Sequence, residues 1–200
     1  IVPNKKWKID NYNERWQKGE TLNVGIGQGF LLSTPLELAI MTGNLINGGK
    51  VIRPNIIKSI PENSKAVESI VRYNNFKIEH LNIIKKAMFN VVNTRKGTAW
   101  KSRSYDKDYS ISGKTGTSQV RIISATERAS GIIKNKDLPL NQRDHALFIG
   151  FAPFNKPKYI TTVVLEHAGG GSTSAAPIGR DLLIASRKIF EGIDTKINVS

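Results

Sequence analysis

The sequence predicts an α+β fold in which helices pack against an antiparallel sheet. Two strongly β-prone runs, 145–152 and 159–167, are separated by a short turn-like loop, which is typical of an antiparallel pair. A third run, 110–120, is rich in β-branched residues and glycine and predicts another extended strand. Helical patterns lie before and after these runs, so we expect a three-stranded sheet with helices against it.

The N-terminal part contains one clear helix signal. Residues 1–23 are polar without an apolar period and predict an irregular segment, followed by a glycine-rich turn at 25–30. Residues 34–37, Thr-Pro-Leu-Glu, combine a threonine cap, a proline at the first helical position and a glutamate that completes a capping box. The helix that begins there is expected to end at the two glycines 48–49, and 51–60 predicts extended chain.

Two further helices are predicted from the spacing of apolar residues. The first covers about 78–93, and its apolar face comprises Leu81, Ile84, Met88 and Val91. The second covers about 174–190 and is expected to pack on the sheet through Ile178, Leu182, Ala185 and Ile189. The long polar connection 121–142 predicts irregular structure and the least order of any internal segment.

Composition excludes several classes of function. The chain has no cysteine, which excludes disulfides and thiol chemistry, and its three histidines are too far apart to suggest a metal site. The formal net charge is +14, but no run of five or six like charges occurs and aromatics make up only 8%. We therefore interpret the charge as a lysine-rich surface and expect no nucleic-acid partner, and the spacing of the histidines leads us to expect no metal.

The sharpest local motif is Ser-Gly-Lys-Thr-Gly-Thr at 112–117. A phosphate-binding P-loop is one alternative, but it requires a glycine where Asp108 stands and a helix where the sequence predicts a strand. The other alternative is the Lys-Thr-Gly strand of penicillin-recognising enzymes, in which a lysine and hydroxyls beside a strand suit a substrate carboxylate. The glycines at 25–30 do not form a dinucleotide-binding motif because Phe30 replaces the last required glycine.

The flanking segments favour the second alternative. Four segments of the chain resemble, in their order and spacing, class B penicillin-binding proteins of the penicillin-binding protein 2 type. They are the glycine turn, the Thr-Pro helix start, the segment SGKTGTSQV and the long segment 143–181. The resemblance implies the penicillin-recognising serine transpeptidase fold, with 1–200 as the C-terminal part of one transpeptidase domain. Because the chain opens at Ile1 without a signal-peptide pattern, we expect it to be a piece of a longer protein.

The resemblance also implies roles for the motif. Lys114 is expected to supply positive potential, and Thr115 and Thr117 are expected to offer hydroxyls to the substrate carboxylate. Gly116 is expected to belong to the same substrate-binding segment. The backbone N–H of Thr117 is expected to be one donor of the oxyanion hole. His145, on an apolar strand, is interpreted as a packed and hydrogen-bonded residue instead of a catalyst.

No nucleophile is expected within these residues. The family's Ser-x-x-Lys and Ser-x-Asn motifs lie upstream of the matched region. The one formal Ser-x-x-Lys, 104–107, directly precedes the Lys-Thr-Gly strand in turn-like sequence, and the similar-looking Tyr-Asn-Asn at 73–75 predicts a loop. We therefore expect the 200-residue chain to be inactive by itself.

The resemblance implies a peptidoglycan D,D-transpeptidase of cell-wall elongation that cross-links stem peptides through a serine acyl-enzyme. Its expected ligands are D-Ala-D-Ala stem peptides and β-lactams. Its expected partners are the elongation-complex glycosyltransferase and other membrane proteins, at the periplasmic side of the bacterial inner membrane. The alternative is a non-catalytic or truncated relative that acts as a binding module.

Overall fold

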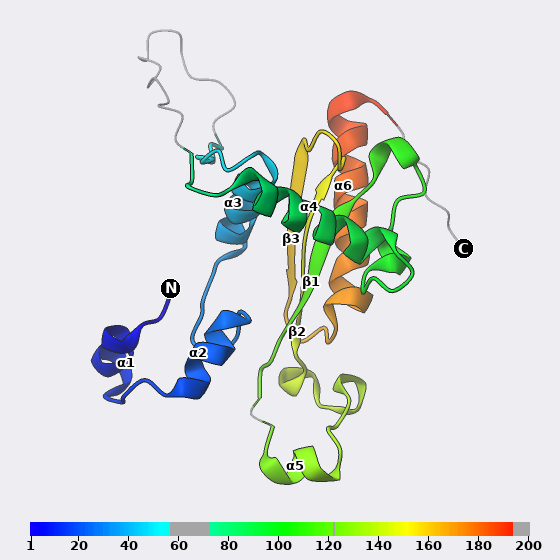
Figure 1. The fold of residues 1–200 in the computed structure, drawn as a ribbon. Coiled ribbons are helices and arrows are strands. Elements are labelled where there is room, and N and C mark those ends of the chain that lie inside the picture. Colours follow the sequence, from blue (N-terminus) through cyan, green and yellow to red (C-terminus); the bar gives the residue numbers. More distant parts are fainter. Residues whose placement is uncertain (57–72, 122, 194–200) are drawn as a thin grey trace. The chain divides into compact units, whose positions relative to one another are not determined.

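The computed structural model describes residues 1–56, 73–121 and 123–193, which form two compact units, Ile1–Glu37 and Leu38–Ser200 (Figure 1). The extended stretch predicted at 51–60 is described only to residue 56, where it forms no regular element. The rest of that prediction lies outside the described residues.

The first unit contains two short helices where the sequence predicted irregular chain. α1 (Lys5–Tyr12) begins at an Asn4 cap, whose side chain accepts the Trp7 N–H at 2.9 Å. α2 (Lys18–Gly25) begins with a capping box formed by Gln17 and Glu20. The prediction was wrong because these helices begin at caps and carry no apolar stripe from which periodicity could reveal them.

A buried lysine and an aromatic cluster hold this unit together. Lys8 is only 2% exposed and pairs with Glu20 and Glu14, and these contacts raise its pKa against the opposing effect of burial. The Trp7 and Phe30 rings lie 5.6 Å apart, centroid to centroid. The glycine turn predicted at 25–30 is confirmed, with positive φ at two of its glycines.

The predicted capping box begins α3 (Pro35–Ile46). The Thr34 N–H donates to the Glu37 carboxylate at 2.8 Å, and the Glu37 N–H donates to the Thr34 hydroxyl at 3.2 Å. The Thr34 N–H and the Thr34 hydroxyl, the latter at 3.1 Å, both donate to the Glu37 carboxylate and lower its pKa. The helix ends just before Gly48 and Gly49, which both adopt positive φ, so the predicted start and stop are confirmed.

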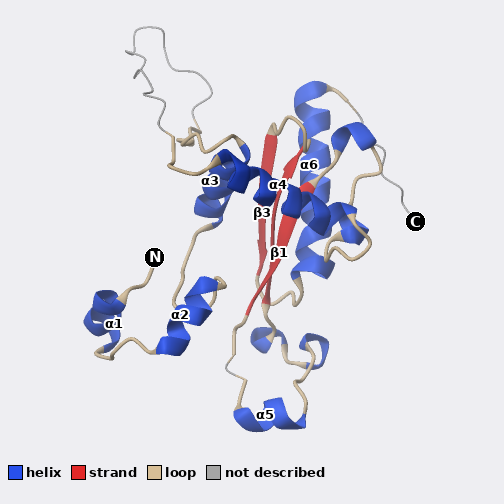
Figure 2. Cartoon of the chain, in the orientation of Figure 1, coloured by secondary structure: helices blue, strands red, loops and turns tan. Residues whose placement is uncertain are grey.

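The second unit contains the predicted antiparallel sheet, in the order β1 (Ser112–Ser118), β2 (His145–Ala152) and β3 (Tyr159–Leu165) (Figure 2). Register pairs Thr115 with Phe148 and Phe148 with Val163. β1 and β3 are therefore the edges of the sheet in the described part of the chain. The fold prediction for all three strands is confirmed.

α4 (Ile78–Asn93) matches its predicted bounds and contacts β1. It buries Leu81 and Met88, as predicted, but Ile84 is 40% exposed and Val92 takes the buried position expected for Val91. Phe151 of β2 packs with Met88 and with α3, and this forms a second, smaller core cluster.

α6 (Ala176–Glu191) lies along the sheet but uses a different face from the one predicted. Its buried residues are Ala176, Gly179, Leu183 and Ile184. The four residues expected to pack on the sheet are all exposed: Ile178, Leu182, Ala185 and Ile189. The prediction was wrong because the contact is made partly by small residues, which let the helix approach the sheet closely.

Phe148 explains this close approach. Its ring is 1% exposed and lies against glycines from three elements. A Cβ atom would lie 2.4 Å from the ring at Gly113, 2.6 Å at Gly150 and 2.3 Å at Gly179. One large side chain of β2 therefore fills the space that these three glycines leave between β1, β2 and α6.

The connection predicted as irregular contains a helix, α5 (Ala125–Ser130), which the Ser124 side chain caps. That part of the prediction was wrong, since a local cap defines this helix without an apolar period. The rest contains two short 3-10 turns, η3 (Asn135–Asp137) and η4 (Leu140–Gln142). The expected low order of 121–142 stays a prediction.

Three short elements complete the unit: η1 (Trp100–Ser102), η2 (Lys107–Tyr109) and η5 (Gly171–Ala175). Among the residues described here, no helix is long and apolar enough to cross a bilayer.

Candidate active site

The Lys-Thr-Gly motif lies in the middle of β1, on an edge of the sheet. Side chains alternate along a strand, so Lys114 belongs to one face and Thr115 and Thr117 to the other. Thr115 pairs with Phe148 across the two strands and shares its face. The structure thus places all the expected motif residues in one extended segment.

The Lys114 side chain is exposed and folds back along its own strand. Its ammonium donates to the Thr115 carbonyl oxygen at 2.6 Å. This contact holds a positive charge beside the Thr115 carbonyl oxygen. An anion at this position would be bound by charge as well as by hydrogen bonds.

Thr115 has a partner that sequence reasoning missed. Its Oγ1 lies 2.8 Å from the Oγ1 of Thr98, which follows α4 in the segment Lys-Gly-Thr. The sequence indicated only the end of a helix there. The two threonines are 17 residues apart and no motif links them.

Gly171, the first residue of η5, lies directly on the motif. A Cβ at this position would be 2.2 Å from the Gly116 carbonyl oxygen and 2.4 Å from that of Leu147. Only glycine fits such an approach without displacing the two strands. The sequence indicated the glycines 169–171 as a strand break and did not predict their contact with β1.

α4 also holds the beginning of β1. The Asn93 side-chain amide donates to the Phe89 carbonyl at 2.9 Å and to the Ile111 carbonyl at 2.8 Å. A single side chain thereby joins the last turn of α4 to the residue that precedes the strand. Sequence spacing indicated α4 but not this bridge.

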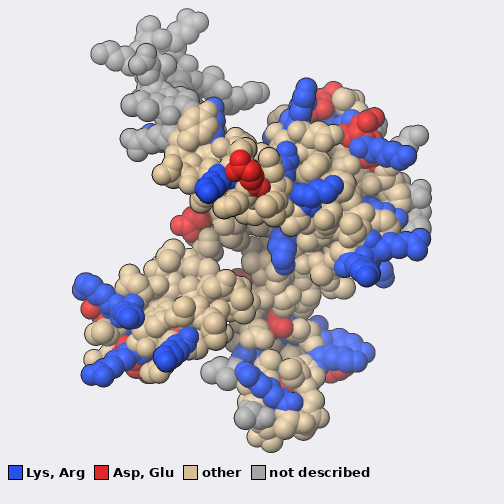
Figure 3. All heavy atoms as spheres, in the orientation of Figure 1, with Lys and Arg blue, Asp and Glu red and all other residues tan. Residues whose placement is uncertain are grey.

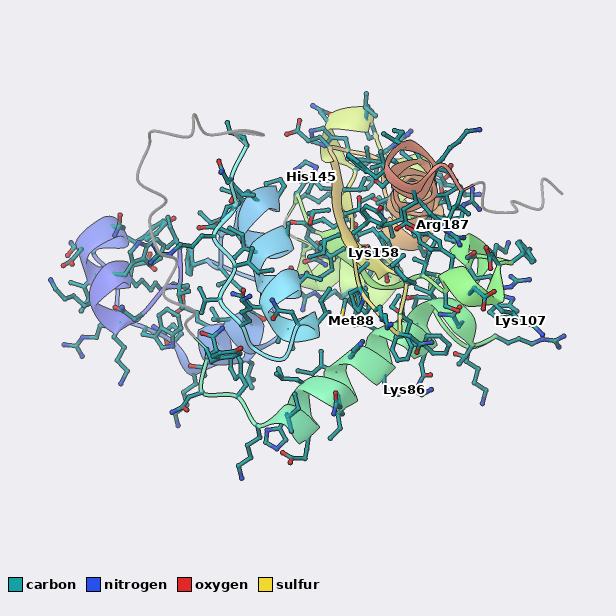
Figure 4. All side chains as sticks on the ribbon, turned by 90° about the horizontal axis from the view of Figure 1, so that it is seen from above. Lys86, Met88, Lys107, His145, Lys158 and Arg187 are labelled. Atoms are coloured by element: carbon teal, nitrogen blue, oxygen red, sulfur yellow. The ribbon has the colours of Figure 1, made fainter. Side chains whose placement is uncertain are left out.

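Ser104 lies in the loop between η1 and η2 and not at the start of a buried helix. Its hydroxyl accepts the Asp106 N–H at 3.1 Å, and Asp106 is in turn held by Arg187 at 2.7 Å. Lys107, the last residue of the formal Ser-x-x-Lys, is exposed at the periphery (Figure 4). This local turn gives Ser104 a structural hydrogen bond.

The interpretation of His145 as a packed residue is confirmed. Its Nδ1 accepts the His167 N–H at 2.9 Å, and the two rings meet edge to face at 4.7 Å. His167 adopts φ +56°, so this bond supports an uncommon backbone conformation just after β3.

A cavity of about 430 Å³ lies beyond the C-terminal end of β1. Its lining combines apolar side chains with charged ones, including Arg121, Lys134 and Asp144. Arg121 forms a two-pronged contact with Glu127, one arm at 2.6 Å, and together with the Ile133 N–H it lowers the pKa of Glu127 to about 2. The cavity wall is therefore fixed by an ion pair.

The distribution of charged side chains can be followed on one face of the molecule. Figure 3 shows Lys and Arg in several separate groups over the visible face, with Asp and Glu among them. Within the described ranges, no cluster of three or more His, Asp or Glu side chains could hold a metal ion.

Comparisons with known proteins identify the family to which the chain is similar. A family model described as penicillin binding protein transpeptidase domain matches residues 3–184. The chain is 38% identical over 186 residues to the peptidoglycan D,D-transpeptidase MrdA of Haemophilus influenzae, a match that covers 91% of this chain and 28% of the relative. The chain thus spans less than a third of the length of that relative.

Two solved structures of penicillin-binding proteins are also similar to this chain. The structure of PBP2 from Pseudomonas aeruginosa in complex with WCK 5153 is similar with a TM-score of 0.72 and 32% identity, covering 99% of this chain and 39% of that one. The structure of PBP2 from Helicobacter pylori in complex with MreC is similar with a TM-score of 0.71 and 32% identity, covering 96% of this chain and 31% of that one.

Proposed function

Because the chain belongs to the penicillin-binding protein transpeptidase domain family, we propose that it supplies the Lys-Thr-Gly side of a serine D,D-transpeptidase active site. The observation that carries the proposal is the placement of the motif on an edge strand, β1, with Lys114 and two threonines along it. An edge strand can receive an extended peptide alongside its own backbone.

In the proposed reaction, a serine from another part of the longer protein attacks the carbonyl of the penultimate D-alanine. The C–N bond to the terminal D-alanine breaks, that residue leaves as an amine, and an acyl-enzyme ester remains. An amine of a neighbouring stem peptide then attacks the ester, forms the cross-link and releases the serine. β-Lactams acylate the same serine.

We assign the motif residues to binding and polarisation. Lys114 supplies a positive charge next to Thr115, and the hydroxyls of Thr115 and Thr117 donate to the terminal carboxylate of the substrate. Gly116 leaves the strand surface open to the peptide. These groups orient the substrate but do not form a covalent bond with it.

The backbone N–H of Thr117 is proposed to donate to the oxyanion. Residues two apart direct their backbone groups to the same side of a strand, so the Thr117 N–H shares its side with the Thr115 carbonyl that Lys114 reaches. One such donor lowers the barrier by about 3 kcal/mol. The second donor is expected from the serine residue itself.

We further propose that the longer protein works at the periplasmic side of the inner membrane, in wall elongation, beside a glycosyltransferase and other membrane proteins. The name of the Haemophilus influenzae relative supports a role in peptidoglycan synthesis, and the complex of a PBP2 with MreC supports binding to another protein. The membrane, the elongation role and the glycosyltransferase rest on the family resemblance. No organic cofactor is required for this reaction.

Acylation by a fluorescent penicillin tests the proposal. In the full-length protein, Lys114→Ala should slow labelling about tenfold to hundredfold, since it removes a charge-assisted hydrogen-bond donor. Lys107→Ala, at an exposed lysine outside β1, is the matched control and should leave the rate unchanged.

The 200-residue chain alone should not be labelled, and labelling should return when the remainder of the domain is supplied. An unchanged rate in Lys114→Ala would remove the role given to the motif. Labelling of the isolated chain that Ser104→Ala abolishes would make Ser104 the nucleophile. Absence of labelling in the full-length protein would favour the non-catalytic binding module.

A further inference from the structure

The contact between Thr98 and Thr115 extends the proposed site beyond the Lys-Thr-Gly strand. The two Oγ1 atoms lie 2.8 Å apart, within the range of a short hydroxyl–hydroxyl hydrogen bond. Thr98 comes from the segment between α4 and η1, so a residue outside the sheet contacts the hydroxyl assigned to the substrate carboxylate.

The backbone around Thr98 is fixed on both sides. A Cβ on Gly97 would lie 2.2 Å from the Val91 carbonyl oxygen, so the chain there is pressed against the last turn of α4. On the other side, Ala99 is 1% exposed, and its N–H donates to the same Val91 carbonyl at 3.0 Å. Thr98 is exposed between these two anchors, which fix its backbone beside β1 and leave its hydroxyl within reach of Thr115.

We propose that Thr98 is a positioning residue that donates its hydroxyl proton to Thr115, so that the Thr115 proton is directed to the substrate carboxylate. A hydroxyl has one proton to donate and two lone pairs that accept. If Thr115 donated to Thr98 instead, it would present only lone pairs to a carboxylate and would repel it. The inference rests on the proposed function, because it requires Thr115 to bind that anion.

The direction of the hydrogen bond can reverse without moving a heavy atom. In the free protein either threonine can donate, and the arriving carboxylate selects the chain that runs from Thr98 through Thr115 to the anion. Each donor in such a chain strengthens the next. The contribution of Thr98 therefore depends on the bound anion, which separates it from a purely structural contact.

Three variants of the full-length protein test this. Thr98→Val removes the hydroxyl and keeps the branched shape, Thr98→Ala removes it without adding a methyl group, and Thr98→Ser keeps it. The matched control is Thr94→Val, since the Thr94 hydroxyl donates only to the Asn90 carbonyl of α4, at 2.7 Å. Saturation kinetics of acylation by a labelled penicillin separate the apparent dissociation constant from the maximal rate of acylation.

We expect Thr98→Val and Thr98→Ala to raise the apparent dissociation constant about threefold to tenfold, the range for losing one neutral hydrogen bond. The maximal rate should change little, because the carboxylate is held equally before and during acylation. Thr98→Ser and Thr94→Val should behave like the unmodified protein, and melting temperatures should be similar for all four.

A double variant separates the role of Thr98 from the role of the Lys-Thr-Gly motif. In a Thr115→Val background, Thr98→Val should have no further effect, since Thr98 acts only through Thr115. Additive effects, or a Thr98→Val variant that behaves like Thr94→Val, would overturn the role of Thr98 and leave the proposed function intact. A Thr115→Val variant with unchanged kinetics would instead overturn the role of the motif itself.

Discussion

Two adjacent leucines of α6 allow the packing of the helix on the sheet to be tested directly. Leu183 is 1% exposed and belongs to the main core cluster, whereas Leu182, about 100° away around the helix axis, is 49% exposed. Replacing a buried leucine by alanine removes its transfer free energy and leaves a cavity, at a cost of about 3 kcal/mol. At Leu182 about half of the transfer term is available and no cavity forms, so the cost is about 1 kcal/mol.

We therefore expect Leu183→Ala to lower the free energy of unfolding about three times as much as Leu182→Ala does. Urea unfolding of the 200-residue chain, followed by circular dichroism, measures both values, and the slopes with urea should agree between the variants. Equal costs, or a larger cost for Leu182→Ala, would refute the observed helix face. That result would support the face expected from the spacing of large apolar residues.

Two other changes have predicted outcomes. Gly171→Ala should push η5 away from β1, because the new methyl group would collide with the Gly116 carbonyl. We expect the free energy of unfolding to fall by about 1–3 kcal/mol and acylation of the full-length protein to become slower. A normal acylation rate would contradict the contact. The folded-state pKa of Glu127 is lowered to about 2, so its contribution to stability is present above its ordinary pKa of 4.5 and is lost as pH falls toward 2. Protection of the Ile133 amide from hydrogen exchange should therefore fall over that pH interval. In Glu127→Gln the protection should no longer depend on pH in this way. An identical pH profile in the variant would argue against the ion pair.

The elements that the sequence predicted well are those whose signals are local. The capping box of Thr34 and Glu37 defined the start of α3, and two β-prone runs separated by a short loop defined β2 and β3. Each of these patterns stabilises its own element, so a single segment is enough to recognise it.

The errors come from contacts that carry no local pattern. In α6, glycine and alanine form part of the buried face, and a search for large apolar residues selects the opposite face. α1 and α2 depend on polar caps and on the buried Lys8. Both helices contain too few apolar residues for a helical period to be recognised in the sequence.

The candidate site divides in the same way. Lys114, Thr115 and Thr117 could be proposed as site residues from the sequence because they belong to one short motif. Thr98 and Gly171 could not, because their contacts with β1 depend on how α4 and η5 are placed after folding.

The Phe148 ring has a consequence for how this sequence can diverge. Gly113, Gly150 and Gly179 each exclude a side chain because the same ring occupies the space that their Cβ atoms would need. A smaller residue at 148 would open room at 179 and, after a slight adjustment of the Ser112 carbonyl, at 150, whereas a Cβ at 113 would still lie 2.5 Å from the Ile149 carbonyl oxygen. Positions 148 and 150 of β2 and 179 of α6 are therefore expected to change as a set, so that substitutions accepted during evolution should be correlated among them.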